Sequence, residues 1–191
     1  GSTNAVLHLT AIAGRAGIDL SLRRLNELSD TTPVLVNLKP VGQHYMEDFF
    51  AAGGMGAILR ELEPLLHLDC TTVTGETLGE RLAAEAGAAW VGRSIISSRD
   101  APLEPEGGLV ALFGSLAPKG AILKRSAADV SLFEREAKAV VFDSLEDLAR
   151  RIDDPALAVE ASDFLVLQNA GPHSAAAMPE AGYLPIPKKL A

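Results

Sequence analysis

The character of the chain changes at residues 97–108, where "SSRDAPLEPEGG" is rich in Pro, Gly and charge and has no apolar periodicity. Stretches of this composition usually connect folded regions. Before this segment most apolar residues recur at helical spacing, and after it most apolar runs have the length of a strand. We therefore predict an α/β region over 1–96, a linker over 97–108 and a second, incomplete domain over 109–191.

The first region mixes helical and strand patterns. The opening "GSTN" offers helix N-cap residues ahead of the apolar series "AVLHLTAIA", and "TPVLVNL" is an apolar run of strand length that Pro40 closes. We interpret this region as the end of a larger α/β domain. Because a helix pattern starts at once and "IPKKLA" stops in what reads as a helical turn, we expect a segment of a longer protein.

Beyond the linker, four short apolar runs are separated by Gly- and Pro-containing turns. One helical pattern, "SLEDLARRIDD", interrupts them, with Ser144 as its expected N-cap. Short strands at turn-like spacing are typical of a β-barrel or a sandwich. We therefore predict a β-barrel-like domain with an inserted helix. The four expected strands lie in "GLVALFGSL", "GAILKRSA", "KAVVFDS" and "DFLVLQNAG".

Charge and composition exclude several classes of function. The formal net charge is −8, with no local basic cluster, which argues against non-specific binding of nucleic acid. No apolar run approaches the roughly 18 residues of a membrane span, and no secretion signal is present. The single cysteine, Cys70, excludes an internal disulfide and fits a cytoplasmic protein. We interpret Cys70 as a buried thiol rather than a nucleophile.

The usual catalytic and cofactor motifs are missing from the sequence. The four histidines are far apart and show no zinc-ligand spacing, and there is no P-loop, GxSxG or GxGxxG pattern. We interpret His8 as a core or edge histidine and give His67 no role in chemistry. No nucleophile–base pair supports a hydrolase. The sequence thus assigns no catalytic and no cofactor-binding residue within this segment.

Two places have sharper chemistry. The hydroxyls and free N–H groups of "GSTN" would suit a small carboxylate or phosphate, although plain helix capping is the favoured interpretation. In "AAAMPEAGYLPIP", prolines on both sides hold Glu180 in a stiff loop. A pre-placed carboxylate is one ligand of the kind that Mg²⁺ takes. On spacing alone, a metal ligand and an exposed carboxylate remain equal alternatives for Glu180.

Six blocks of the sequence resemble, in the same order, blocks of the dihydroxy-acid and sugar-acid dehydratases. They are "GSTNAVLHLTAIA", "PVLVNLKPVGQHYMEDFFAAGG", "DCTTVTGETLGE", "GGLVALFGSLAPKGAILK", "AVVFDSLEDL" and "NAGPHSAAAMPEAGYLPIPKKL". The resemblance covers essentially the whole chain, and the last block is closer to the sugar-acid branch. It implies an α/β domain followed by a β-barrel-like domain.

The resemblance also implies a function. The expected reaction removes water from a 2,3-dihydroxy acid or sugar acid and gives a 2-keto acid. It implies Mg²⁺, with Glu180 as one ligand. It further implies an iron–sulfur cluster, 2Fe–2S in preference to 4Fe–4S, whose cysteine ligands belong to family blocks upstream of this segment. The catalytic serine belongs to a block downstream, so we expect the segment alone to be inactive.

Some expectations concern partners and alternatives. The expected partner is a small hydroxy acid, and the family resemblance implies a homodimer or homotetramer; neither nucleic acid nor membrane is expected. Before the Glu, family loops are Gly-rich, whereas this chain has "GPHSAAAMPE". This departure motivates the alternative of a catalytically silent relative, or a fragment, that binds a small acid or a partner.

Overall fold

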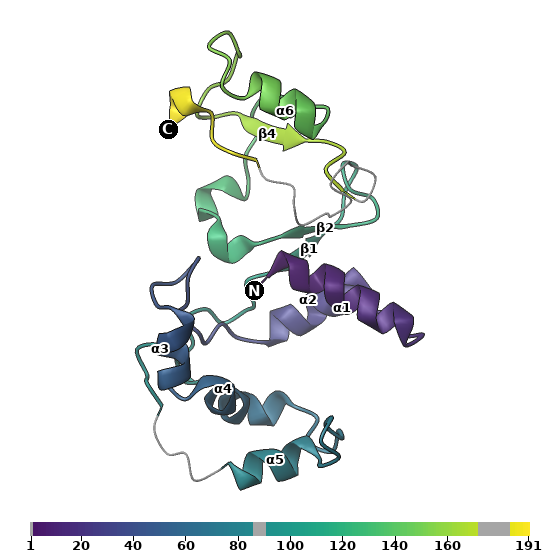
Figure 1. The fold of residues 1–191 in the computed structure, drawn as a ribbon, viewed down its shortest axis with the longest axis vertical. Helices are drawn as coiled ribbons and strands as arrows, with labels where there is room; N and C mark the ends of the chain where they lie inside the picture. The colour runs from purple at the N-terminus through teal and green to yellow at the C-terminus, as the bar shows by residue number, and fades with distance from the viewer. Residues whose placement is uncertain (1, 86–90, 172–183) are drawn as a thin grey trace. The chain divides into compact units, whose positions relative to one another are not determined.

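The computed structural model describes residues 2–85, 91–171 and 184–191 of the protein (Figure 1). The chain divides into two compact units, Gly1–Ala128 and Asp129–Ala191. Each unit has a hydrophobic core of its own, one around Phe49 and Ile96 and the other around Phe142 and Leu148. Among the described residues, no helix is long and apolar enough to cross a membrane.

The first unit begins as a series of helices, as the apolar spacing predicted. Two of its helices have side-chain N-caps: the Ser21 side chain accepts a hydrogen bond from the N–H of Arg24, and Thr77 forms a capping box with Glu80. The helices are α1 (Thr3–Arg15), α2 (Leu22–Thr31), α3 (Met46–Ala51), α4 (Gly54–Leu62) and α5 (Leu78–Ala84), with the 3₁₀ turn η1 (Glu63–Leu65) after α4.

The strand predicted in "TPVLVNL" forms isolated bridges instead of a regular ladder. Val34 bridges Glu104, Val36 bridges Ile96 and Leu38 bridges His44. The partner segment contains two prolines within 102–105, and a proline has no N–H to donate to a ladder. The prediction of an extended segment is therefore confirmed, and that of a regular strand is wrong.

A short hairpin follows the bridged segment. Strand β1 (Val110–Leu112) pairs antiparallel with β2 (Ala121–Leu123), with Val110 opposite Leu123. The 3₁₀ turn η2 (Arg125–Ala127) comes directly after β2. Both strands lie where the apolar runs predicted them.

The second unit is built around a β–α–β arrangement. Strands β3 (Ala139–Phe142) and β4 (Phe164–Leu167) are parallel, and α6 (Leu145–Arg151) lies between them in the chain. Parallel neighbours need a crossover connection of this kind. Figure 1 shows α6 beside β4, and both contribute apolar side chains to the core. Ser144 caps α6 as predicted, accepting from the Asp147 N–H at 3.1 Å. The 3₁₀ turns η3 (Val130–Leu132) and η5 (Lys188–Leu190) lie in the same unit.

The predicted β-barrel-like domain is not present in the part of the chain that the structure describes. Its four strands form two separate two-stranded sheets, β1–β2 and β3–β4, and no closed barrel. The strands are three or four residues long, and those of the second sheet are joined by a helix rather than by hairpins. Strands this short, split between two sheets, cannot supply the staggered continuous pairing of a barrel. The helix and strand content nevertheless agrees with a mixed α/β class.

The segment 97–108 is tied to the first unit by backbone hydrogen bonds. Ser97 donates to the Leu35 carbonyl at 2.8 Å, and Gly107 donates to the Ser29 carbonyl at 2.7 Å. The division of the chain into two compact units falls after Ala128. The domain boundary expected at 97–108 stays a prediction.

Candidate functional site

Glu180, the metal ligand that the sequence predicted, lies outside the described residues, as does His173. Its role therefore stays a prediction. Among the residues that are described, no group of three or more His, Cys, Asp and Glu side chains comes close enough together to hold a metal ion. The described part of the chain does not by itself provide a metal site.

An iron–sulfur cluster does not fit this chain alone. Such clusters are held by several cysteine thiolates, and the sequence contains one cysteine. Cys70 is exposed, so the expectation of a buried thiol is wrong. It lies in a turn in which its N–H donates to the His67 carbonyl and its carbonyl accepts from the Leu78 N–H, at 3.2 and 2.9 Å. The cluster expected from the resemblance would need ligands from outside these 191 residues.

The remaining sequence candidates are at the surface or partly buried. His8 and His67 are both exposed, so His8 is not a core residue. Ser2 is the N-cap of α1 in extended conformation, but within the described residues its side chain makes no cap hydrogen bond. The capping interpretation of "GSTN" is therefore not confirmed for the Ser2 hydroxyl. The backbone carbonyl of Ser2 accepts from the Ala5 N–H at 3.2 Å.

The best-formed candidate site among the described residues is a tight polar loop that runs into the first turn of α3, residues 37–48. No motif in the sequence marks it. The loop closes through bonds from the Gly42 N–H to the Leu38 carbonyl at 2.7 Å and from the Lys39 N–H to the His44 carbonyl at 2.8 Å. The Asn37 side chain accepts from the Gln43 N–H at 2.9 Å. A Cβ on Gly42 would lie 2.3 Å from the Asn37 Oδ1, so only glycine fits there.

This loop brings an ammonium and a phenol together at the surface. Lys39 Nζ donates to the Tyr45 hydroxyl and lies 4.0 Å from the centroid of the same ring. Tyr45 is the N-cap of α3, and its N–H donates to the Asp48 carboxylate at 2.9 Å. The His44 imidazole lies 3.9 Å from that carboxylate. An ammonium and a phenolic O–H side by side are donors suited to a carboxylate.

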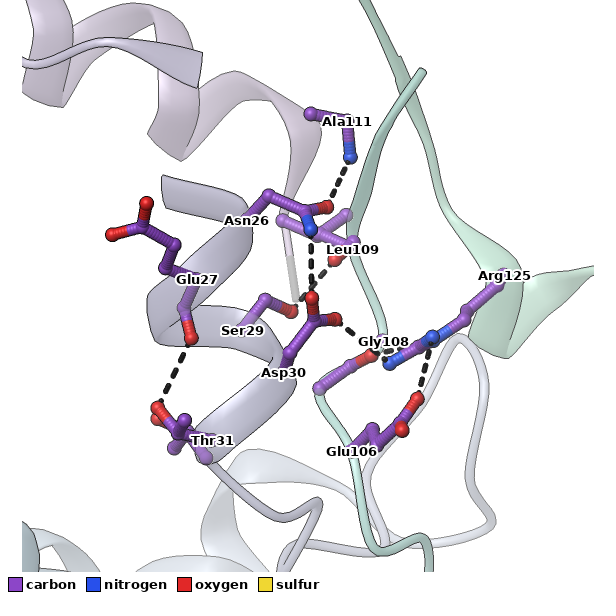
Figure 2. A network of polar contacts seen from close by, with 12 residues as sticks. Asn26, Glu27, Ser29, Asp30, Thr31, Glu106, Gly108, Leu109, Ala111 and Arg125 are labelled. Carbon is purple, nitrogen blue, oxygen red and sulfur yellow. Dashed lines mark hydrogen bonds and ion pairs between the residues drawn. The ribbon is translucent and has the colours of Figure 1, made fainter. Parts of the chain in front are cut away.

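A second polar cluster joins α2 to the segment that leads into β1, as Figure 2 shows. Ser29 Oγ donates to the Leu109 carbonyl at 2.6 Å, and Asn26 Oδ1 accepts from the Ala111 N–H at 2.7 Å. Arg125 Nε donates to the Gly107 carbonyl at 2.8 Å. Each of these three bonds ends on a backbone group of residues 107–111, so the cluster is suited to holding that backbone in place.

Glu61 on α4 has a largely buried carboxylate with a shifted pKa. Its carboxylate accepts from the Arg99 N–H at 3.1 Å and lies 2.6 Å from the Arg93 guanidinium. Burial alone would raise the pKa of Glu61, but the Arg99 hydrogen bond and the Arg93 charge together lower it below its usual value. Glu61 is therefore held as an anion and is suited to structure rather than to proton transfer.

Comparison with known proteins adds what the described geometry does not show. Residues 1–81 match the N-terminal region, and residues 94–191 the C-terminal region, of the dihydroxy-acid/6-phosphogluconate dehydratases. A 6-deoxy-6-sulfo-D-gluconate dehydratase of Pseudomonas putida is 49% identical over 193 residues, covering 100% of this chain and 33% of the relative.

Two further relatives represent the two branches that the sequence blocks resembled. An L-arabinonate dehydratase of Rhizobium leguminosarum bv. trifolii is 42% identical, covering 100% of this chain and 33% of the relative. A dihydroxy-acid dehydratase of Caldanaerobacter subterraneus subsp. tengcongensis is 41% identical, covering 94% of this chain and 32% of the relative. The chain thus spans about a third of the length of these curated relatives. It belongs to the dihydroxy-acid/6-phosphogluconate dehydratase family.

Proposed function

We propose that this chain is part of a dehydratase that acts on a sugar acid or another 2,3-dihydroxy acid. The observation that carries the proposal is the 49% identity to a sugar-acid dehydratase over the whole chain, together with the match to both family regions. In this reaction the substrate loses a proton from C2 and hydroxide from C3, which together leave as water. The resulting enol tautomerises to a 2-keto acid, so no oxidant or reductant is consumed.

The cofactors are part of the same proposal. We propose Mg²⁺, with Glu180 as one ligand, and an iron–sulfur cluster of the 2Fe–2S type with cysteine ligands outside this chain. When bound, a divalent cation stabilises negative charge that develops on substrate oxygens. One carboxylate from this chain is consistent with the one or two that Mg²⁺ usually takes.

Within the described residues, the 37–48 loop supports binding of an acid. The chain carries a net charge of −8, so an anionic substrate needs a local positive group to offset the overall repulsion. Lys39 supplies that charge, and the Tyr45 hydroxyl beside it adds a neutral donor. We propose that this pair contacts a carboxylate of the substrate, and that Asn37 and Gly42 hold the loop in shape for it.

The setting of the protein is also proposed rather than shown. We propose a cytoplasmic location, which fits a chain with one cysteine. A homodimer or homotetramer and a small hydroxy acid are the proposed partners, and the acidic net charge is unfavourable for nucleic acid.

The activity is tested on the full-length protein that contains this chain. Its iron–sulfur cluster is reconstituted, Mg²⁺ is added, and 2-keto acid formation is measured with L-arabinonate, 6-deoxy-6-sulfo-D-gluconate and a branched 2,3-dihydroxy acid. Turnover of at least one acid is expected. No turnover of any acid, with the cluster present by its absorption spectrum, would favour the catalytically silent relative instead.

Two variants test the residues. Glu180→Gln removes the proposed ligand and is expected to raise the Mg²⁺ concentration needed for half-maximal turnover, whereas Glu160→Gln, at an exposed position, leaves that concentration unchanged. Lys39→Met is expected to raise KM by about tenfold, the effect of losing one charge-assisted hydrogen bond. Lys119→Met, also exposed, is its matched control. Unchanged KM in Lys39→Met would remove the 37–48 loop from the proposal and leave the reaction itself untouched.

A further inference from the structure

Two segments far apart in the sequence run antiparallel along each other in the first unit. We call these segments, 22–37 and 95–113, the seam. At one end the Asn37 N–H donates to the Ile95 carbonyl at 2.9 Å. In the middle, the Val34 N–H donates to the Glu104 carbonyl at 2.9 Å, and the Leu103 N–H donates back to Val34 at 2.8 Å. Backbone pairing therefore covers the non-helical half of the seam.

In the other half, α2 replaces the extended strand and side chains take over the pairing. The Gly107 N–H donates to the Ser29 carbonyl at 2.7 Å. Ser29 Oγ donates to the Leu109 carbonyl, and Asn26 accepts from the Ala111 N–H (Figure 2). At the far end, the Arg23 guanidinium lies 4.3 Å from the centroid of the Phe113 ring. The contacts thus progress in one direction along α2 and in the opposite direction along 107–113.

Arg125, at the start of η2, contacts both segments of the seam. Its Nη1 lies 2.8 Å from the Glu106 carboxylate, and its Nη2 lies 3.8 Å from the Asp30 carboxylate (Figure 2). Nη2 is buried and has no hydrogen-bond partner among the described residues, so the Asp30 charge is what compensates it. Arg125 therefore depends on one acid from each side of the seam.

The backbone at residues 107–108 approaches α2 and η2 so closely that the two positions require glycine. A Cβ on Gly107 would lie 2.3 Å from the Ser29 Oγ and 2.7 Å from the Ser29 carbonyl oxygen. A Cβ on Gly108 would lie 2.5 Å from the Ser126 Oγ. Contacts this short are incompatible with a side chain, so "GG" at 107–108 is required by packing against α2 and η2.

The seam crosses the division between the two family regions. Segment 22–37 lies in the N-terminal region, 1–81, and segment 95–113 lies in the C-terminal region, 94–191. Both nevertheless belong to one compact unit, which ends at Ala128. The regions defined by sequence similarity and the units defined by packing therefore differ by residues 94–128.

We propose that residues 94–128 fold and unfold with the N-terminal family region rather than with the rest of the C-terminal one, and that Arg125 is the positioning residue that holds them there. The seam is then a permanent junction between the two family regions. Any relative movement within this chain occurs after Ala128. The proposal goes beyond the dehydratase activity and does not depend on it.

Hydrogen exchange of backbone amides in the full-length protein tests this proposal. In the wild type, the amides of Val34 and of Gly107 and Ala111 are expected to share one opening free energy as denaturant is added. The amides of Phe164 and Gln168, which bond between the β3 and β4 segments, serve as the internal reference and are expected to have a different opening free energy. Exchange of Gly107 and Ala111 in step with Phe164, and apart from Val34, would overturn the proposal.

Variants of Arg125 separate positioning from general stability. Arg125→Met is expected to raise exchange at Val34, Gly107 and Ala111 by the same factor of about ten, which corresponds to about 1.4 kcal/mol. Arg125→Lys keeps one charge and is expected to restore part of the protection. Unequal factors on the two sides of the seam would contradict the proposal. If Arg125→Met does not fold, the proposal is tested by the wild-type exchange pattern alone.

The matched control lies on α2, the helix that carries Asp30. Arg24→Met removes an equal charge from α2, where Arg24 forms an exposed ion pair with Glu27 at 3.0 Å. Exposed pairs of this kind contribute little. Exchange along the seam is expected to stay within about twofold of the wild type in this variant. A change as large as that of Arg125→Met would show that charge on α2, rather than the contacts of Arg125 with Asp30 and Glu106, determines the stability of the seam.

Discussion

The side chain of Asn26 accepts a hydrogen bond from the backbone N–H of Ala111 at 2.7 Å, across 85 positions of the chain. The same amide group donates from Nδ2 to the Asp30 carboxylate at 2.7 Å. Asp30 in turn faces Arg125. One side chain therefore links β1 to the ion pair of Asp30 with Arg125, and the register of α2 against β1 follows from it.

Replacing Asn26 tests that link. Asn26→Leu leaves the Ala111 N–H without its partner, and we expect the free energy of unfolding to fall by about 1–3 kcal/mol. Urea denaturation followed by circular dichroism measures the change. Asn4→Leu, at an exposed position of α1, is the control and should alter stability by less than about 0.5 kcal/mol.

Gly107 tests the close approach. Gly107→Ala places a Cβ against Ser29, and we expect a loss of about 1–3 kcal/mol because the backbone must separate from α2. Gly114→Ala is the matched control, since a Cβ there meets nothing within 4 Å. Equal thermal midpoints for the two variants would show that the segment does not lie against α2 in solution.

Glu61 makes part of the stability depend on pH. Its pKa is lower in the folded state than its ordinary value of 4.5, so the unfolded chain binds more protons in the window below about pH 4.5. The stabilisation is complete above that window and is lost as the pH falls through the folded pKa. The gap in unfolding free energy between wild type and Glu61→Gln should therefore shrink below about pH 4.5.

A control for this pH effect lies two residues further along the chain. Glu63→Gln removes an exposed carboxylate from η1, and its difference from wild type should stay small at every pH. A gap for Glu61→Gln that stays constant from neutral pH down to pH 3 would contradict the role assigned to the Arg93 and Arg99 contacts.

The core of the second unit rests on Phe142, which is fully buried against α6 and β4. Phe142→Ala should cost about 3–5 kcal/mol through lost burial and the cavity left behind. Phe164 lies in the same sheet but is 41% exposed, so Phe164→Ala should cost clearly less. Denaturation monitored at the second unit, by exchange of the Gln168 amide, distinguishes the two.

Local signals in the sequence predicted local structure well. The cap at Ser144 was predictable because a capping side chain bonds within three residues of itself. The four short strands after residue 108 were readable from their apolar runs. The prediction of a barrel was wrong, because apolar periodicity identifies a strand but does not show which strand it pairs with. Cys70 was misplaced because the turn that exposes it depends on a bond to Leu78, eight positions on.

The candidate site was predictable only in part. Glu180 was proposed from its prolines and from the family blocks, and its role stays a prediction because it lies outside the described residues. The Lys39–Tyr45 pair was missed because the tight closure of its loop depends on Asn37 and Gly42, which show no recognisable motif. The Asn26–Ala111 bond has no sequence signal at all, since its partners are 85 positions apart and one of them is a backbone group.

The two sheets have a practical consequence for anyone who cuts this protein into pieces. Among the described residues each sheet has only two strands, so each strand has one edge whose backbone groups are not paired within its sheet. Unpaired edges are templates for contact with other chains. A fragment containing β3 and β4 is therefore prone to aggregate through these edges. A lysine in place of Val141, which is 36% exposed on β3, is the substitution to try first for keeping such a fragment in solution.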